Sequence, residues 1–172
     1  MQYWTPLRVV KRAAEWLNDV NACHVVDIGS GAGKFCVAAA MLNRARFTGL
    51  EQSRSLVGSA RALARVFGVD GRVTFVHGVF GAVMTPIADV YYLYNPFGNY
   101  WFDLRAERHI ECTTERRLQE VAHVERFIGT VPDGTYILTY HGFGGRMPAC
   151  CHLVCADLTL AGGLRLWRKG EP

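Results

Sequence analysis

The sequence lacks an apolar run long enough to cross a membrane. An apolar stretch such as residues 35–42 is far shorter than the roughly 18 residues that a membrane-spanning helix requires. The N-terminus also lacks the layout of a secretory signal peptide. We therefore expect a soluble, cytoplasmic protein with no membrane partner. The 172 residues, 50% of them hydrophobic, predict one globular domain that spans residues 1–172.

The six cysteines lack the paired spacing of a zinc site. Only Cys150, Cys151, His152 and Cys155 stand close together, and the alternating apolar residues around them favour a strand over a metal site. A cytosolic chain keeps such cysteines reduced. We therefore predict no metal site.

Charge of either sign is not gathered into a run. The formal net charge is +4, and its basic part comes from 16 arginines and only 3 lysines. The arginines are scattered through predicted helices, so the sequence does not support a dedicated nucleic-acid face.

Strand-like and helix-like segments alternate through most of the chain. Strands are predicted at residues 24–28, 46–51, 73–77, 89–94 and 135–140, and helices lie between most of them. This alternation predicts an α/β fold with a mainly parallel, doubly wound sheet. The helix over about residues 113–128 carries six charged residues, which we interpret as a solvated face.

The first helix has its own start signal. Thr5 is predicted as its N-cap and Pro6 as its first helical residue. Its buried stripe is predicted to be Leu7, Val10, Ala14 and Leu17.

The C-terminal segment departs from the alternation. Residues 151–158 and 164–168 are two strand-like runs around Gly162 and Gly163, which predicts an antiparallel hairpin and brings the strand count to seven. Only residues 141–150 separate this hairpin from the fifth strand, so a helix in that interval must be shortened or missing.

The most informative segment joins a buried strand to a helix. After Asp27, glycine occupies every second position, at Gly29, Gly31 and Gly33. Glycines at such a join let backbone N–H groups approach a ligand at a helix N-terminus. Asp27-x-Gly-x-Gly-x-Gly is therefore a candidate binding loop.

The spacing of this loop argues against two common phosphate sites. A P-loop requires glycine six positions before its lysine and a hydroxyl residue after it, but Ile28 and Phe35 stand there around Lys34. A dinucleotide fingerprint requires a small residue where Lys34 stands.

The remaining pattern resembles the cofactor loop of class I S-adenosylmethionine-dependent methyltransferases. The resemblance implies a three-layer Rossmann-like sandwich whose last strand is inserted antiparallel beside the fifth. It also implies S-adenosyl-L-methionine as cofactor, with Asp27 and the loop of Gly29, Ser30, Gly31 and Gly33 around its methionine part. Thr5 and the first helix are expected to cover the cofactor.

Further candidate contacts follow the second and third strands. Glu51 ends the second strand, where its two carboxylate oxygens suit the vicinal hydroxyls of a ribose, and Gln52 next to it is expected near the adenine. The resemblance implies an acid near the end of the third strand, but Val79 stands at that position. His77 or a backbone group is the predicted substitute.

Asn95, Pro96 and Phe97 follow the fourth strand. They resemble the Asn-Pro-Pro-aromatic motif of methyltransferases that act on amino nitrogens, with one proline in place of two. The resemblance implies that Asn95 and the Pro96 carbonyl accept hydrogen bonds from the target nitrogen, that the Phe97 ring stacks on the target, and that Asn95 also contacts the cofactor. The alternative interpretation is a turn with Phe97 packed inward.

These motifs predict a methyltransferase that acts on an unidentified acceptor, with an amino nitrogen as one candidate. A small molecule or a protein is favoured over a nucleic acid. A non-catalytic S-adenosylmethionine-binding or scaffold protein remains the alternative, since Val79 and the single proline depart from the family pattern. A nicotinamide-dependent oxidoreductase is a third hypothesis, because such enzymes share the fold.

His141 is a candidate catalytic base or a plain loop residue. The exposed edge of the predicted hairpin allows the protein to be a monomer or a homodimer.

Overall fold

The structure is a computed structural model that describes residues 4–94 and 110–171. Most predicted elements are present with closely similar limits. In chain order they are α1 (Leu7–Asp19), β1 (His24–Ile28), α2 (Lys34–Leu42), β2 (Arg46–Glu51), α3 (Arg54–Val66), β3 (Val73–His77), β4 (Val90–Tyr94), α4 (Ile110–Thr130), β5 (Tyr136–Tyr140), β6 (Cys151–Asp157) and β7 (Leu164–Lys169).

The seven strands form one sheet in the order β3-β2-β1-β4-β5-β7-β6. The strands β1 to β5 are parallel to one another, whereas β7 is antiparallel to both β5 and β6. The last strand therefore lies between β5 and β6, which confirms the predicted insertion. No helix occurs in residues 141–150, so the chain passes from β5 to the hairpin through a loop.

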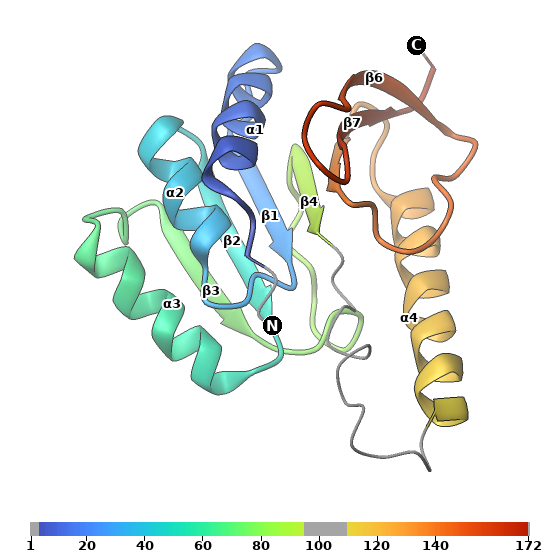
Figure 1. Cartoon of the computed structure of the whole chain (residues 1–172), viewed down its shortest axis with the longest axis horizontal. Helices are drawn as coiled ribbons and strands as arrows, with labels where there is room; N and C mark the ends of the chain where they lie inside the picture. The colour runs from blue at the N-terminus through green and yellow to red at the C-terminus, as the bar shows by residue number, and fades with distance from the viewer. Residues whose placement is uncertain (1–3, 95–109, 172) are drawn as a thin grey trace.

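Helices cover both faces of the sheet and make three layers (Figure 1). The helices α1, α2 and α3 lie on one face, and α4 lies on the other. Successive strand residues point to opposite faces, so Val25 belongs to the core under α1–α3 while Val26 belongs to the core under α4. Both side chains are fully buried, which explains the non-alternating apolar pattern of β1.

The start of α1 differs from the prediction. Pro6 is the N-cap, in an extended conformation, and the helix begins at Leu7. The Thr5 hydroxyl does not cap the helix, because it lies 3.0 Å from the Tyr92 hydroxyl and makes its hydrogen bond there. Leu7 is 64% exposed rather than buried, while Val10, Ala14 and Leu17 are buried as predicted.

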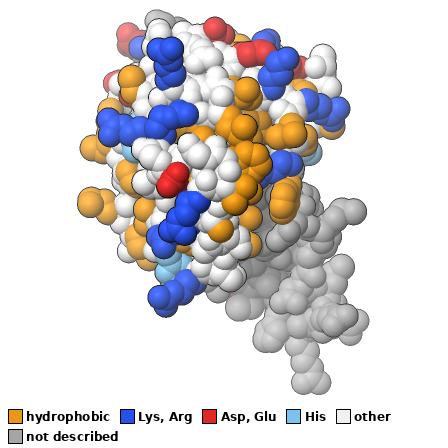
Figure 2. Space-filling view, turned by 90° about the vertical axis from the view of Figure 1, so that its left-hand side faces the viewer, with side chains coloured by type: hydrophobic (Ala, Val, Ile, Leu, Met, Phe, Trp, Pro, Cys, Tyr) orange, Lys and Arg blue, Asp and Glu red, His pale blue; other side chains and the backbone are white. Residues whose placement is uncertain are grey.

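Basic side chains lie among hydrophobic ones on the side of the molecule that carries α2 and α3 (Figure 2). Two arginines of this part of the chain have structural partners. Arg61 donates to the Phe75 carbonyl across 2.8 Å. Arg72 donates to the carbonyls of Ala40 and Asn43 across 2.7 Å each, which satisfies acceptors at the end of α2. Within the described ranges, no helix has both the length and the apolar character needed to cross a membrane.

Candidate functional site

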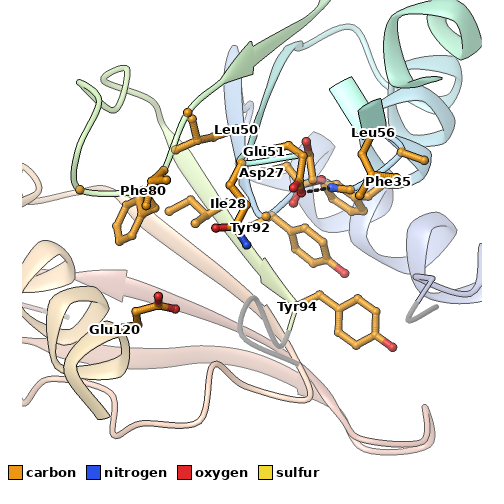
Figure 3. A pocket seen from close by; sticks show the side chains of 18 of the residues that line it. Asp27, Ile28, Phe35, Leu50, Glu51, Leu56, Phe80, Tyr92, Tyr94 and Glu120 are labelled. Atoms are coloured by element: carbon orange, nitrogen blue, oxygen red, sulfur yellow. Dashed lines mark hydrogen bonds between the residues drawn. The ribbon is translucent and has the colours of Figure 1, made fainter. Parts of the chain in front are cut away.

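A cavity of about 490 Å³ opens where β1, β2 and β4 end. Its walls are Trp4 and Thr5, residues 27–32 at the end of β1 and in the loop after it, the ends of β2 and β4, residues 78–82, and one face of α4. Figure 3 shows Asp27 and Glu51 on one side of it and Glu120 of α4 on another. Binding at the carboxyl ends of parallel strands is the general behaviour of open α/β sheets.

The three glycines of the loop have positive φ angles of 80° at Gly29, 56° at Gly31 and 79° at Gly33. A Cβ at Gly33 would lie 2.5 Å from the Phe75 ring, so close packing of the loop on the sheet also requires glycine there. Gly31 has open space where a Cβ would stand. The second glycine therefore leaves room for a ligand, whereas the third lets the loop pack closely.

Glu51 ties this loop to the rest of the sheet. One carboxylate oxygen accepts a hydrogen bond from the Gly31 N–H across 2.9 Å, and the other accepts from the Ser53 N–H across 2.7 Å. The side chain lines the cavity although the residue is only 8% exposed. Each carboxylate oxygen has two acceptor positions, so one position on each is left by these two bonds.

Asp27 lies at the cavity floor and is 4% exposed. The pKa of its carboxyl is raised to about 7, mainly because burial disfavours the charged form. The nearby charge of Glu51 also raises this pKa, whereas the hydrogen bond from the Cys36 thiol across 3.4 Å lowers it. A cationic group placed beside Asp27 would favour the ionised carboxylate.

The N-terminal segment covers one side of the cavity. The Thr5 hydroxyl pairs with the Tyr92 hydroxyl, and the Tyr92 ring stacks on Phe35 with centroids 3.7 Å apart. Beside them, the Lys34 ammonium lies 5.3 Å from the centre of the Trp4 ring. The sequence predicted that Thr5 would cover this site, but it did not indicate Trp4 or Lys34.

Sequence analysis also missed the α4 wall. Gln119, Glu120, His123 and Arg126 line the cavity, although Glu120 and Arg126 were predicted to belong to a solvated face. Their spacing of three and four residues indicates a common helix face, but only packing determines where that face points. Glu125 also has a partner, since its carboxylate accepts from the Arg146 N–H across 2.7 Å.

The cavity brings most of the predicted cofactor contacts together. Asp27, Gly29, Ser30, Gly31, Glu51 and Gln52 line it. The Ser30 hydroxyl is buried and has no hydrogen-bond partner in the described ranges. A Cβ at Gly49 would lie 2.5 Å from that oxygen, so the hydroxyl packs against β2.

Other predicted residues lie elsewhere. His77 does not line the cavity, and its Nε2 lies 3.1 Å from the Gln52 carbonyl oxygen. His141, with a φ of 57°, places its ring against Gly162 of the hairpin turn and does not line the cavity either. Asn95, Pro96 and Phe97 lie outside the described residues.

Comparison with known families settles the class of protein. A family model described as a methyltransferase domain matches residues 19–104, half of the chain. The chain belongs to this methyltransferase family. The match includes the glycine loop, Glu51 and the strands that carry them, so the predicted family and activity class are confirmed.

Two solved methyltransferase structures share the fold over most of their length. An RNA methyltransferase from Salinibacter ruber in complex with S-adenosyl-L-homocysteine is 24% identical, with a TM-score of 0.69, and the match covers 99% of this chain and 95% of that chain. A putative O-methyltransferase from Klebsiella pneumoniae is 14% identical, with a TM-score of 0.68 and coverage of 99% and 84%.

The O-methyltransferase NcsB1 from neocarzinostatin biosynthesis was solved with S-adenosylmethionine and 2-hydroxy-5-methyl naphthoic acid. It is 17% identical, with a TM-score of 0.62, and the match covers 93% of this chain and 56% of that chain. At these identities the likeness shows the fold, which confirms the predicted Rossmann-like architecture. The Salinibacter ruber enzyme and NcsB1 were solved with S-adenosyl-L-homocysteine and with S-adenosylmethionine, which is the cofactor that the sequence predicts for this chain.

Proposed function

We propose that the cavity holds S-adenosylmethionine through Asp27, the loop from Gly29 to Gly33, and Glu51. The observation that carries this assignment is the bonding of Glu51. Its buried carboxylate keeps one acceptor position on each oxygen after binding the N–H groups of Gly31 and Ser53. Two adjacent acceptors match the two adjacent hydroxyl donors of a ribose.

The other end of the cavity suits the methionine part of the cofactor. Asp27 is a buried acceptor, and a ligand ammonium would offset the cost of ionising it. The open space beside Gly31 and the positive φ angles of the loop let its backbone approach the ligand closely. Gln52 lines the adenine side, and His77 has the role of holding the Gln52 carbonyl.

When bound, the cofactor supplies a methyl group that is already activated on a sulfonium. The task of this chain is therefore to position an acceptor and exclude water. One wall of the cavity is held in shape by the packing of Phe35 on Tyr92 and by the hydrogen bond between Tyr92 and Thr5. The proton that an acceptor nitrogen loses can pass to solvent after transfer, so no charged catalytic side chain is required.

The acceptor we propose is an amino nitrogen of a small molecule or a protein. This part of the proposal is supported by the resemblance of Asn95, Pro96 and Phe97 to the motif of amino methyltransferases. Incubating cell extract with isotopically labelled cofactor and identifying labelled products by mass spectrometry tests it. Label on oxygen, carbon or nucleic acid alone would contradict the proposed acceptor class.

We also propose that residues 1–172 form a single cytoplasmic domain that acts as a monomer or a homodimer. The continuous seven-stranded sheet supports one domain, and the free thiols of Cys23, Cys36, Cys150, Cys151 and Cys155 agree with a reducing compartment. Light scattering coupled to size-exclusion chromatography measures the oligomeric state.

Calorimetric titration with S-adenosylmethionine and S-adenosylhomocysteine tests the cavity itself. We expect saturable binding of one molecule per chain for both ligands. Failure of both to bind at millimolar concentration would overturn the proposed site.

A further inference from the structure

A buried thiol lies behind the carboxylate at the floor of the cavity. Cys36 is fully buried in the first turn of α2, and its Sγ lies 3.4 Å from Oδ2 of Asp27. An ionised carboxylate only accepts hydrogen bonds, so the thiol is the donor. Burial raises the pKa of the Cys36 thiol well above its ordinary value, so the proton of this bond stays on sulfur.

The place of this thiol is fixed by the start of α2. Gly33 is the N-cap of the helix, and its carbonyl accepts a hydrogen bond from the Val37 N–H across 2.9 Å. Cys36 itself packs in the core under α1–α3. The bond from its thiol therefore joins the first turn of α2 to the end of β1, where Asp27 lies. The helix turn that follows the glycine loop thus presents a donor to the back of the cavity floor.

Cys36 is the one hydrogen-bond donor to the Asp27 side chain in the described part of the chain. Glu51 of β2 lies on the same side of the cavity (Figure 3), and its negative charge opposes the ionisation of Asp27. Tyr92 of β4 is near enough to interact with that charge, but its hydroxyl pairs with the N-terminal segment. The Lys34 ammonium lies against an indole ring, 5.3 Å from its centre. Among these groups, the thiol is the one whose hydrogen bond favours the ionised form of Asp27.

From this contact we infer that Cys36 is a positioning residue for the bound cofactor. Its thiol holds one carboxylate oxygen of Asp27 from behind and leaves the other oxygen for a ligand ammonium. Cys36 does not line the cavity, so it acts only through Asp27. The inference rests on the proposed cofactor site and adds to it a residue behind the cavity floor. Removing the donor should make Asp27 harder to ionise and so move ligand binding to higher pH.

Calorimetric titration of the full chain with S-adenosylhomocysteine between about pH 6 and 8.5 measures this effect. Cys36→Ala removes the donor, so the pH at which affinity reaches half of its plateau should rise by about half a unit. Affinity should then fall about threefold at pH 6 and change by less than about twofold at pH 8. Cys36→Ser supplies a hydroxyl donor in place of the thiol and should return the midpoint close to the wild-type value.

Val37→Ala is the matched control, because it truncates a neighbouring side chain of α2 that is also buried. It should lower the free energy of unfolding without moving the pH midpoint. His123 also lines the cavity, and imidazoles can change charge in the same pH range. The Asp27→Asn background separates the two groups, since Cys36→Ala should leave the pH profile unchanged there.

The outcomes separate the role of Cys36 from the proposed cofactor site. An unshifted midpoint in Cys36→Ala, or an equal shift in Val37→Ala, overturns the role of Cys36 while the site stands. A shift in Cys36→Ser as large as in Cys36→Ala also overturns it. If Cys36→Ala does not fold, Cys36→Val, which fills the space without a donor, is read in the same way. A wild-type chain that binds S-adenosylhomocysteine without pH dependence overturns this inference and the Asp27 contact, and failure to bind overturns both proposals.

Discussion

The carboxylate of Glu51 accepts a hydrogen bond from the backbone N–H of Gly31, with 2.9 Å between oxygen and nitrogen. This bond joins the end of β2 to the loop that follows β1. The second oxygen of Glu51 accepts from Ser53, the N-cap of α3. One buried side chain thus sets the position of the glycine loop and the start of a helix, and it lines the cavity at the same time.

Replacing Glu51 should therefore weaken both binding and folding. In Glu51→Ala, both backbone donors lose their acceptor, which should lower the free energy of unfolding by about 1–3 kcal/mol. The binding free energy of S-adenosylhomocysteine should become less favourable by about 1–3 kcal/mol. Urea unfolding and calorimetry measure the two effects. Asp70→Asn, at an exposed position, is the control and should change neither. An unchanged ligand affinity in Glu51→Ala would refute its ribose role.

The buried carboxyl of Asp27 should make stability depend on pH. Its pKa is raised to about 7 in the folded chain, so between about pH 4 and pH 7 the folded state holds a proton that the unfolded state has lost. Stability should therefore fall as pH rises through this window, by on the order of a few kcal/mol, and level off above it. Asp27→Asn should remove this slope. Urea unfolding from pH 4.5 to 8 tests it, and parallel profiles for the two proteins would contradict the assignment.

Ligand binding should show the opposite pH dependence. A ligand ammonium interacts with the ionised form of Asp27, which becomes populated only near and above pH 7. Affinity for S-adenosylhomocysteine should therefore rise between pH 6 and 8 and stay nearly constant in Asp27→Asn. Calorimetry in buffers of different ionisation enthalpy should detect proton release by the wild-type chain near pH 6. Equal pH profiles would argue that Asp27 does not face the ammonium.

The loop glycines should respond differently to the same substitution. Gly33→Ala combines a positive φ with a Cβ 2.5 Å from the Phe75 ring, so we expect a loss of about 2–4 kcal/mol of stability. Gly31→Ala meets open space and should cost only about 1–2 kcal/mol of backbone strain. Gly142→Ala is the matched control, because it has a φ of 70° and open space outside the cavity.

Thermal or urea unfolding measures the three stabilities, and titration with S-adenosylhomocysteine separates them further. Gly31→Ala should weaken ligand binding, whereas Gly142→Ala should leave it unchanged at a similar cost in stability. Equal ligand affinities in these two variants would show that the loop backbone at Gly31 is not near the ligand.

Short-range patterns predicted most of the sheet and the side of the cavity that contains the glycine loop and Glu51. The buried run of β1, the glycines after it and the acid that ends β2 are local features, since each depends on residues adjacent in the chain. The mainly parallel sheet followed from the alternation of strands and helices, and the C-terminal hairpin from the signal at Gly162 and Gly163. The insertion of the last strand beside the fifth was implied only by the resemblance to the methyltransferase family. Thr5 was placed near the site, but as a helix cap, because the sequence does not show that Tyr92 competes for its hydroxyl.

The sequence by itself determined the family, the glycine loop and the acidic partner at Glu51, because these depend on backbone conformation and spacing over a few residues. Only the tertiary structure decided that Glu120 and His123 face the cavity. Polar residues occur on more than one side of α4, so the sequence does not show which side faces the cavity. The rotation of α4 about its own axis is set by the contacts of Phe127 with Phe80 and Tyr91, which are more than 30 residues away in the chain. Side chains so distant in sequence meet only when the sheet and α4 pack together.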